Sequence, residues 1–271
     1  MPVAEEVHAG PECGGLAELT DPLGDVEEAI VLYAGAGRLL LEPDDQAAAA
    51  IAFANAGGEI ERAARALAAQ ANGPAAPAAA LVGEATAALI AAIRAEGLEG
   101  AGGAARLRAL FFDTFGHALS PDHPLYETQY GDDPVFRQPQ RLADVSGFYR
   151  AFGVEVGPAA HERVDHVGVE MEFLALLTAR EATARAAGEP DRARTCSLAI
   201  EVFLREHLAP VLPTFARLLG EHARERFYPA AARLAQAVCA WDCARRGVQA
   251  AADDRARLVR VIEPDPEEVD E

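Results

Sequence analysis

The stretch HERVDHVGVEMEFLALL, residues 161–177, joins a run of acids to an apolar helical pattern. Four apolar residues recur three or four positions apart, the spacing of one buried helix face: Val167, Met171, Leu174 and Leu177. Alternating runs rich in β-branched residues, which would indicate strands, are absent from the sequence. The stretch therefore predicts an all-α fold with a helix over about 161–187 in its core.

The polar side of the same stretch is open to several interpretations. Five titratable side chains lie within eleven residues: Glu162, Asp165, His166, Glu170 and Glu172. They could ligate a metal, form an acid/base pair, dock a basic partner, or face solvent on an ordinary helix. If the helix begins at about 161, Glu162, His166 and Glu170 share one face at four-residue steps.

Metal and enzyme chemistry are the weaker interpretations. A di-iron bundle would need a Glu-x-x-His pair on each of two helices, and the one such spacing is Glu5 and His8 near the N-terminus. The sequence contains no GxSxG elbow, P-loop or GxGxxG motif. Neighbours such as Asp165 and His166 project about 100° apart on a helix and usually serve different partners. We therefore expect no catalytic residues, no metal and no cofactor, and keep a metal- or nucleotide-dependent enzyme as the alternative.

Gly168 is out of place in this helix. Glycine in a helix interior costs about 1 kcal/mol relative to alanine, so its presence suggests that another backbone approaches closely. The acids of the first turns also suit the positive end of the helix dipole, an explanation that requires no function.

The charge balance narrows the class of partner. The 271 residues contain 24 basic and 43 acidic side chains, a net charge of −19, and every basic residue is arginine. Nucleic acid is therefore not expected as a partner. The start MPVAEEVHAG lacks a secretory pattern, and the most apolar run, residues 75–93, carries Pro77, Gly83 and Glu84. We expect a cytoplasmic protein without membrane insertion.

The pattern along the chain predicts three regions. Residues 1–24 read as a flexible N-terminal arm, residues 25–250 as one helical domain, and residues 251–271 as an acidic C-terminal tail, whose last nine residues contain six acids. Expected helices lie at 26–41, 44–70, 78–96, 104–115, 140–152, 161–187, 191–208, 210–220 and 222–247. Residues 116–139 form a long loop with prolines and tyrosines, which leaves open whether the domain is a single bundle or two helical halves joined by a hinge. The four cysteines are expected to be buried thiols.

Several motifs together carry a resemblance to a known family. They are PLYETQYG (124–131), FRQPQRLADVSGFYRAFGVEV (136–156), ERVDHVGVEMEFLALL (162–177), FLREHLAPVLPTFARLL (203–219) and FYPAAARLAQAVCAWD (227–242). In this order they resemble the TorD-like redox-enzyme maturation chaperones. The branch serving enzymes of the dimethyl-sulfoxide-reductase type, including ethylbenzene and dimethyl sulfide dehydrogenases, looks most similar. The resemblance covers about residues 110–243.

This resemblance implies a function and a set of site residues. Such chaperones bind the apo catalytic subunit of a molybdopterin-dependent enzyme before cofactor insertion, and often hold its twin-arginine signal peptide. Motif by motif, the implied client-binding residues are Asp165, His166, Glu170, Glu162, Tyr126, Glu127, Tyr130 and His207. The sequence departs from the family pattern at one point, because Val211 or Leu212 stands where the family has a tryptophan. The acids and His166 are then a polar patch beside an apolar groove. An assembly subunit retained in the mature reductase is a further alternative, and the sequence does not decide between a monomer and a helix-swapped dimer.

Overall fold

The computed structural model describes residues 25–43, 55–116, 122–131, 138–157 and 162–250. Helices make up most of these residues, and no β-sheet occurs among them. The helices are α1 (Val26–Leu40), α3 (Asn55–Gln70), α4 (Ala76–Ala95), α5 (Gly103–Phe115), α6 (Gln138–Ala151), α7 (Val167–Ala186), α8 (Pro190–Phe203), α9 (Ala209–His222) and α10 (Phe227–Arg246). The predicted all-α fold is confirmed.

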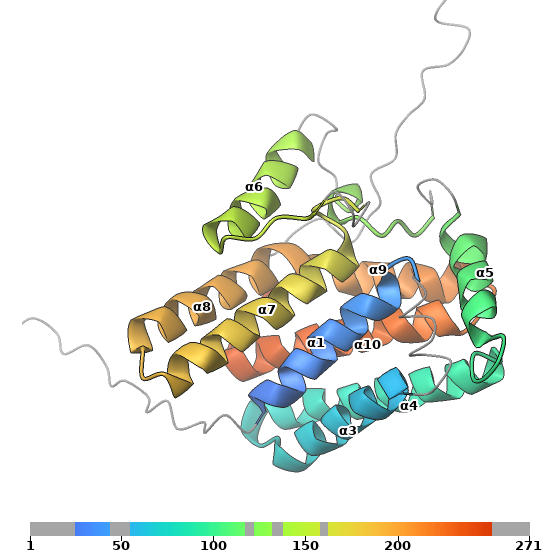
Figure 1. Cartoon of the computed structure of the whole chain (residues 1–271), viewed down its shortest axis with the longest axis horizontal. Coiled ribbons are helices and arrows are strands. Elements are labelled where there is room, and N and C mark those ends of the chain that lie inside the picture. Colours follow the sequence, from blue (N-terminus) through green and yellow to red (C-terminus); the bar gives the residue numbers. More distant parts are fainter. Residues whose placement is uncertain (1–24, 44–54, 117–121, 132–137, 158–161, 251–271) are drawn as a thin grey trace, which may run out of the picture.

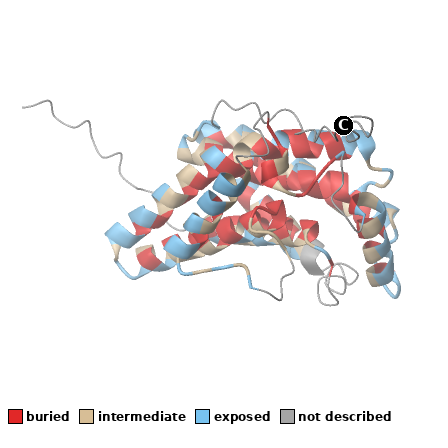
Figure 2. Ribbon diagram, turned by 90° about the horizontal axis from the view of Figure 1, so that it is seen from above, coloured by how far each residue is buried: buried red, intermediate tan, exposed pale blue. Residues whose placement is uncertain are grey.

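The helices pack as a bundle around α1 and α10. Helix α1 contacts α7, α3 and α10, while α10 also packs against α4 and α9, and α8 packs along α7. Helix α5 crosses one end of the bundle, and α6 lies outside it, above α7 and α8 (Figure 1). Buried residues line the inward faces of the helices, and exposed residues mark their outer faces (Figure 2).

Large apolar side chains fill the centre of the bundle. The largest fully buried ones include Tyr33, Phe203, Phe215, Tyr228 and Trp241, each at most 1% exposed. All four apolar residues of the predicted core face of α7 are buried, as the helical spacing predicts. The buried cysteines Cys196, Cys239 and Cys243 are free thiols, also as expected.

One buried carboxylate ties three of the helices together. Asp242 of α10 has no exposed surface and accepts a 2.8 Å hydrogen bond from the hydroxyl of Tyr33 in α1. It also binds the guanidinium groups of Arg245 and Arg246, and Arg246 reaches Glu181 of α7 at 2.9 Å. Burial alone would raise the pKa of Asp242, but the two arginines lower it to about 2. The carboxylate is therefore charged and fully paired.

Helices α8 and α9 are continuous, although the sequence predicts a break near Pro210. A π-helical turn, η5 (Leu204–Leu208), joins them and holds one extra residue. Pro210 lies in the first turn of α9. The π turn carries Glu206 and His207, which line a groove beside α6.

Two predicted helix starts are wrong. Helix α7 begins at Val167 rather than at about 161, and α10 begins at Phe227 rather than at 222. Residues 162–166 precede α7, so Glu162 and His166 are not on a helix face with Glu170. The one-face arrangement of these three side chains is therefore wrong, and with it the geometry of the metal interpretation.

Some predictions lie outside the described residues. They concern the arm at 1–24, the tail at 251–271, Cys13 and parts of the 116–139 loop. Among the described residues, one helical stretch, Gly73–Ala95, is long and apolar enough to cross a membrane, and 33% of its most apolar part is buried inside the bundle. The core helix of a soluble protein meets the same criterion, so this is weak evidence for a membrane span.

Candidate functional site

Two motifs that are 40 residues apart in sequence lie side by side. Tyr126 and His166 form an antiparallel β-bridge. The backbone N–H of Glu127 donates to the carbonyl of Asp165 at 2.8 Å, and that of Val167 donates to the carbonyl of Leu125 at 2.8 Å. The segment 122–131 is therefore fixed to the start of α7.

The side chain of Asp165 adds a second link between these segments. Its Oδ2 accepts hydrogen bonds from the hydroxyl of Thr128 at 2.7 Å and from its backbone N–H at 3.3 Å. Arg163 binds both carboxylate oxygens, at 2.9 and 2.8 Å, and also donates to the Thr128 hydroxyl. The Asp165 side chain has no exposed surface, and these bonds compensate for burying its charge.

His166 is the N-cap residue of α7. Its Nδ1 accepts a 3.0 Å hydrogen bond from the backbone N–H of Gly168. An accepting Nδ1 carries no proton, so the neutral ring is protonated at Nε2. Burial, assisted by the charge of Arg163, lowers the pKa of His166 to about 3. The ring is therefore neutral near pH 7 and caps the helix.

Glu162, Tyr126 and Arg163 form the partly exposed rim beside this cap. The Tyr126 hydroxyl donates to Oε2 of Glu162 at 3.4 Å, and the Arg163 guanidinium lies 4.5 Å from the centre of the Tyr126 ring. Partial burial raises the pKa of Glu162. Burial and the neighbouring Glu162 raise the pKa of Tyr126. Of the predicted site residues near Asp165, Glu162 and Tyr126 are the ones with accessible surface.

Glu170 and Tyr130 lie beneath the surface. Glu170 has no exposed surface. The pKa of the neighbouring Tyr149 is raised mainly by the burial of Tyr149 and, after that, by the charge of Glu170. Tyr149 donates its hydroxyl hydrogen to the carbonyl of Val164 at 2.9 Å. Tyr130 is also fully buried and donates to the carbonyl of Pro124 at 2.6 Å, which fixes the loop from within.

Glu127 and His207 form a buried pair that brings together two separate motifs. Nδ1 of His207 lies 2.9 Å from Oε2 of Glu127, and the residues are 6% and 1% exposed. His207 comes from the π turn, and Glu127 from a 3-10 turn, η2 (Glu127–Gln129). The rings of Phe148 and Phe203 lie 5.5 and 4.6 Å from the His207 ring, centre to centre. The pair is thus polar at its centre and aromatic around it.

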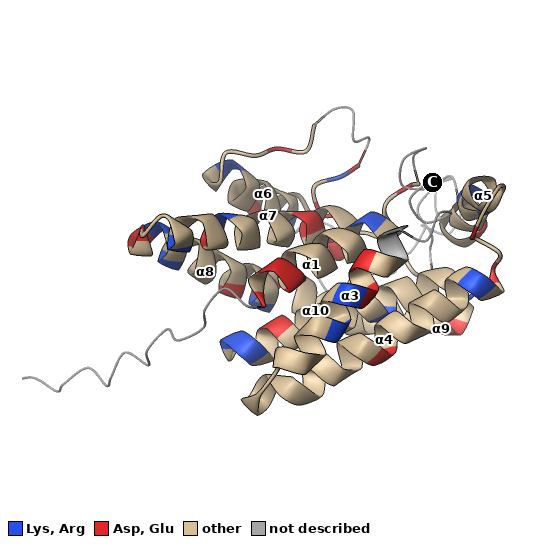
Figure 3. Ribbon diagram, turned by 60° about the horizontal axis from the view of Figure 1, so that its bottom comes forward, with Lys and Arg blue, Asp and Glu red and all other residues tan. Residues whose placement is uncertain are grey.

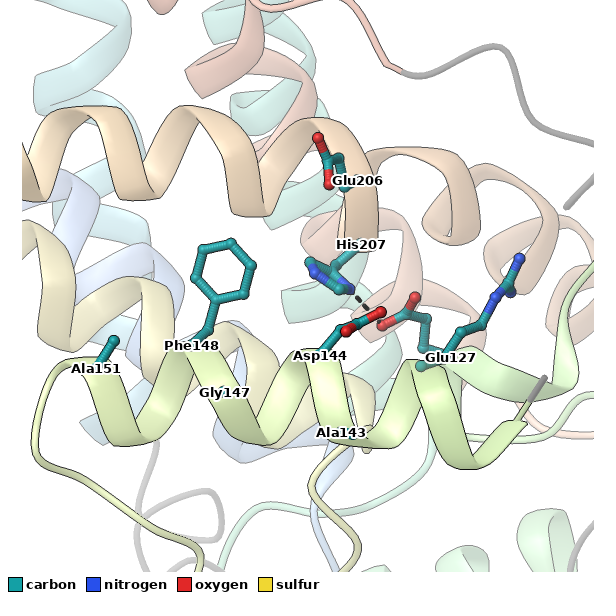
Figure 4. Close-up of a pocket in the computed structure, with 9 residues that line it drawn as sticks. Glu127, Ala143, Asp144, Gly147, Phe148, Ala151, Glu206 and His207 are labelled. Carbon is teal, nitrogen blue, oxygen red and sulfur yellow. Dashed lines mark hydrogen bonds and ion pairs between the residues drawn. The ribbon is translucent and has the colours of Figure 1, made fainter.

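A groove of about 620 Å³ opens over this pair, between α6 and the π turn. Figure 4 shows α6 along one side, with His207 and Glu127 joined at the other. Small side chains of α6 shape its wall, and they are Ala143, Gly147 and Ala151. Two exposed acids, Asp144 and Glu206, also line it, together with the partly exposed Arg141. The volume is in the range of ordinary ligand sites, and the lining suits an apolar segment that carries positive charge.

The structure brings most of the predicted site residues together but gives them unequal access. Asp165, His166, Glu170 and Tyr130 are internal, Tyr126 and Glu162 are partly exposed, and Glu127 and His207 line the groove. Client contact by the internal residues stays a prediction. Sequence reasoning missed Arg163, Thr128 and the α6 wall. The sequence did offer a signal for Arg163, because this basic residue stands two positions before Asp165 in the same motif.

Two further observations concern metal binding and the similarity of the chain to known proteins. Within the part of the chain that is described, no group of three or more His, Cys, Asp or Glu side chains could hold a metal ion. The model of one protein family, described as nitrate reductase delta subunit, matches residues 75–217. This range contains the segment 122–131, the start of α7 and the π turn. No curated protein matches the chain.

Proposed function

The chain belongs to the nitrate reductase delta subunit family, whose members are chaperones for molybdoenzyme maturation, and we propose that it binds its client through the groove between α6 and the π turn. The client is the apo catalytic subunit of a molybdopterin-dependent oxidoreductase, held in the cytoplasm before cofactor insertion. The observation that carries this proposal is the buried Glu127–His207 pair on the floor of the groove, within the range matched by the family.

The chemistry of the groove favours a basic and apolar segment of the client. Arginine binds carboxylates through paired charge-assisted hydrogen bonds, and the exposed Asp144 and Glu206 supply two carboxylates there, beside Arg141. The small residues of α6 leave room for apolar side chains beside Phe148. A twin-arginine signal peptide, which joins arginines to an apolar helix, has this composition and is the segment we propose.

Asp165, His166 and Glu170 then act through the groove's architecture. Their side chains have no exposed surface, so a client does not touch them in this conformation. Asp165 and His166 hold the segment 122–131 on the start of α7, and this segment carries Glu127 to the groove. Glu162 and Tyr126 offer the accessible part of the same region. We propose that they extend the client contact beyond the groove.

The finer identity of the client rests on sequence resemblance. We propose an enzyme of the dimethyl-sulfoxide-reductase type, in the branch with ethylbenzene and dimethyl sulfide dehydrogenases. The chaperone turns over no substrate, and it acts as a monomer or as a helix-swapped dimer.

Filling the groove tests the proposal. Ala143→Trp places a large ring on the exposed wall of the groove and leaves the residues Glu127 and His207 unchanged. Cells lacking the chaperone are complemented with this variant, and the molybdenum content and activity of the client are measured. We expect the client to stay largely without cofactor, and expect the tagged variant to recover little apo catalytic subunit.

The matched control is Ala80→Trp, on an exposed position of α4 far along the chain from the groove. It should support maturation like the native chain. Equal performance of both variants would contradict the groove as the client site. Recovery of a cofactor-loaded, active enzyme with the native chain would instead identify a retained subunit, and stoichiometric metal or nucleotide in the purified chain would favour the enzyme alternative.

A further inference from the structure

A second groove, of about 380 Å³, lies between α4, α9 and α10 on another side of the bundle. Small side chains form its floor, among them Ala88 and Ala91 of α4, Gly220 and Ala230. The face of the bundle that carries α4 and α9 is turned forward in Figure 3, where α4 shows few charged residues. Ala88 and Ala91 are exposed, so apolar surface faces solvent there.

The charged residues that line this groove are two arginines and one glutamate, in a molecule that is acidic as a whole. Arg226 and Arg233 line it and are exposed, and within the described residues neither guanidinium group makes an ion pair. Glu225 also lines the groove, but its carboxylate accepts from the backbone N–H groups of Phe227 and Tyr228, at the start of α10. The carboxylate of Glu96 likewise accepts from the backbone N–H of Arg226 at 3.0 Å. Some other exposed arginines of the bundle are paired, for example Arg217 with Glu221 at 2.9 Å. The groove therefore offers two cations to a ligand in a protein whose net charge is −19.

The sequence itself contains a segment of matching chemistry. Residues 263–271, EPDPEEVDE, contain six acids, and Val261 and Ile262 precede them. The acidic remainder of the molecule repels such a segment, while the two arginines attract it and the alanine floor accepts its apolar side chains. We infer that the acidic C-terminal segment of the chain binds in the groove between α4, α9 and α10.

The length of the chain permits this contact. The described residues end at 250, just past the C-terminal end of α10, and Arg226 precedes the other end of that helix. A helix of 20 residues is about 30 Å long, and the 12 residues 251–262 span up to about 40 Å when extended. The acids can therefore reach both arginines by running back along α10.

Attachment to the same chain makes weak ion pairs sufficient. Exposed arginine–carboxylate pairs contribute little individually and are screened by salt. A tethered segment, however, is present at an effective concentration in the millimolar range. The segment then occupies the groove at low ionic strength and covers the apolar floor, and it gives way to salt or to a competing acidic peptide.

Competition with a labelled peptide tests this inference. The probe is a fluorescent peptide of residues 261–271, and its binding to full-length chains is followed by anisotropy in low salt. In the neutral-tail chain the six acids become Gln or Asn at Glu263, Asp265, Glu267, Glu268, Asp270 and Glu271. We expect this chain to bind the peptide about tenfold more tightly than the native chain, whose own segment competes.

Changes in the groove supply the specific control. In the neutral-tail chain, Arg226→Glu with Arg233→Glu should weaken peptide binding at least tenfold, while the two lysine replacements should retain most of it. Arg150→Glu with Arg194→Glu changes the same net charge on exposed positions of α6 and α8 and should have little effect. Equal peptide affinity of the native and neutral-tail chains, no binding to the neutral-tail chain, or equal losses in both charge-reversed pairs would each overturn the inference.

Discussion

Gly37 of α1 and Gly168 of α7 touch backbone to backbone. A Cβ atom on Gly168 would lie 2.9 Å from the carbonyl oxygen of Gly37, and one on Gly37 would lie 2.7 Å from the carbonyl oxygen of Gly168. Real Cβ atoms do not approach so closely, so both positions require glycine. The first turn of α7 is thereby held by α1 on one side, while Asp165 and His166 hold it to the segment 122–131.

This contact predicts a specific sensitivity to alanine. Gly168→Ala forces α1 and α7 apart, and we expect it to lower the free energy of unfolding by about 1–3 kcal/mol, as overpacking does in other cores. Gly83→Ala in α4 is the control, because a Cβ there meets nothing within 4 Å. The control should stabilise the chain by about 0.5–1 kcal/mol through helix propensity. Denaturant unfolding measures both, and equal effects would contradict the close contact.

The buried cap at His166 predicts a pH dependence. Its pKa falls from 6.5 to about 3 on folding, so below pH 6.5 the unfolded state takes up a proton that the folded state does not. Stability is therefore fully present above pH 6.5 and is lost as the pH falls, by up to about 1.4 kcal/mol per pH unit. Between pH 7 and 5 the loss from this residue should be about 2 kcal/mol.

His166→Asn isolates this contribution, because asparagine caps helices but does not titrate. Unfolding free energies of the native chain and the variant are compared from pH 7 to 5. The difference between them should shrink as the pH falls. A constant difference across this range would show that His166 does not change its pKa on folding.

The sequence predicted the helical content well and the ends of helices poorly. Apolar spacing located α7 and its core face, and Gly168 correctly indicated a close backbone. The start of α7 was misplaced because residues 162–166 carry no helix breaker and their acids suit a first turn. Tertiary contacts set the start of α7 at Val167: the bridge between His166 and Tyr126, and the hydrogen bond from Thr128 to Asp165.

The groove was less accessible to sequence reasoning than the motifs around it. Glu127 and His207 were both expected at the site, but their pairing depends on the π turn, which follows from no local pattern. Helix α6 was predicted as a helix. Nothing in residues 138–151, however, indicates that Ala143 and Gly147 line a groove together with His207. Such relations depend on how distant segments pack.

The Asp242 network predicts a large cost for one small change. Asp242→Asn leaves Arg245 and Arg246 largely buried beside a neutral amide, and breaking a buried pair in this way costs about 3–5 kcal/mol. Glu221→Gln removes one partner of the exposed pair with Arg217 and should cost at most about 1 kcal/mol. Thermal and denaturant melts compare the two variants. Similar small losses in both would mean that the buried charges are not coupled.

Asp165→Asn separates a scaffold role from a direct contact with the client. The substitution keeps the shape of the side chain but replaces its charge-assisted bonds to Arg163 and Thr128 with weaker ones. We expect the free energy of unfolding to fall by about 1.5–3 kcal/mol, the usual contribution of a hydrogen bond to a charged group. Because the carboxylate is buried, the folded fraction should bind the client's signal peptide with native affinity. Peptide titration at a temperature where the variant is fully folded, alongside a denaturant melt, measures both quantities. Loss of affinity with unchanged stability would mean that the segment 122–131 opens during binding and that Asp165 itself meets the client.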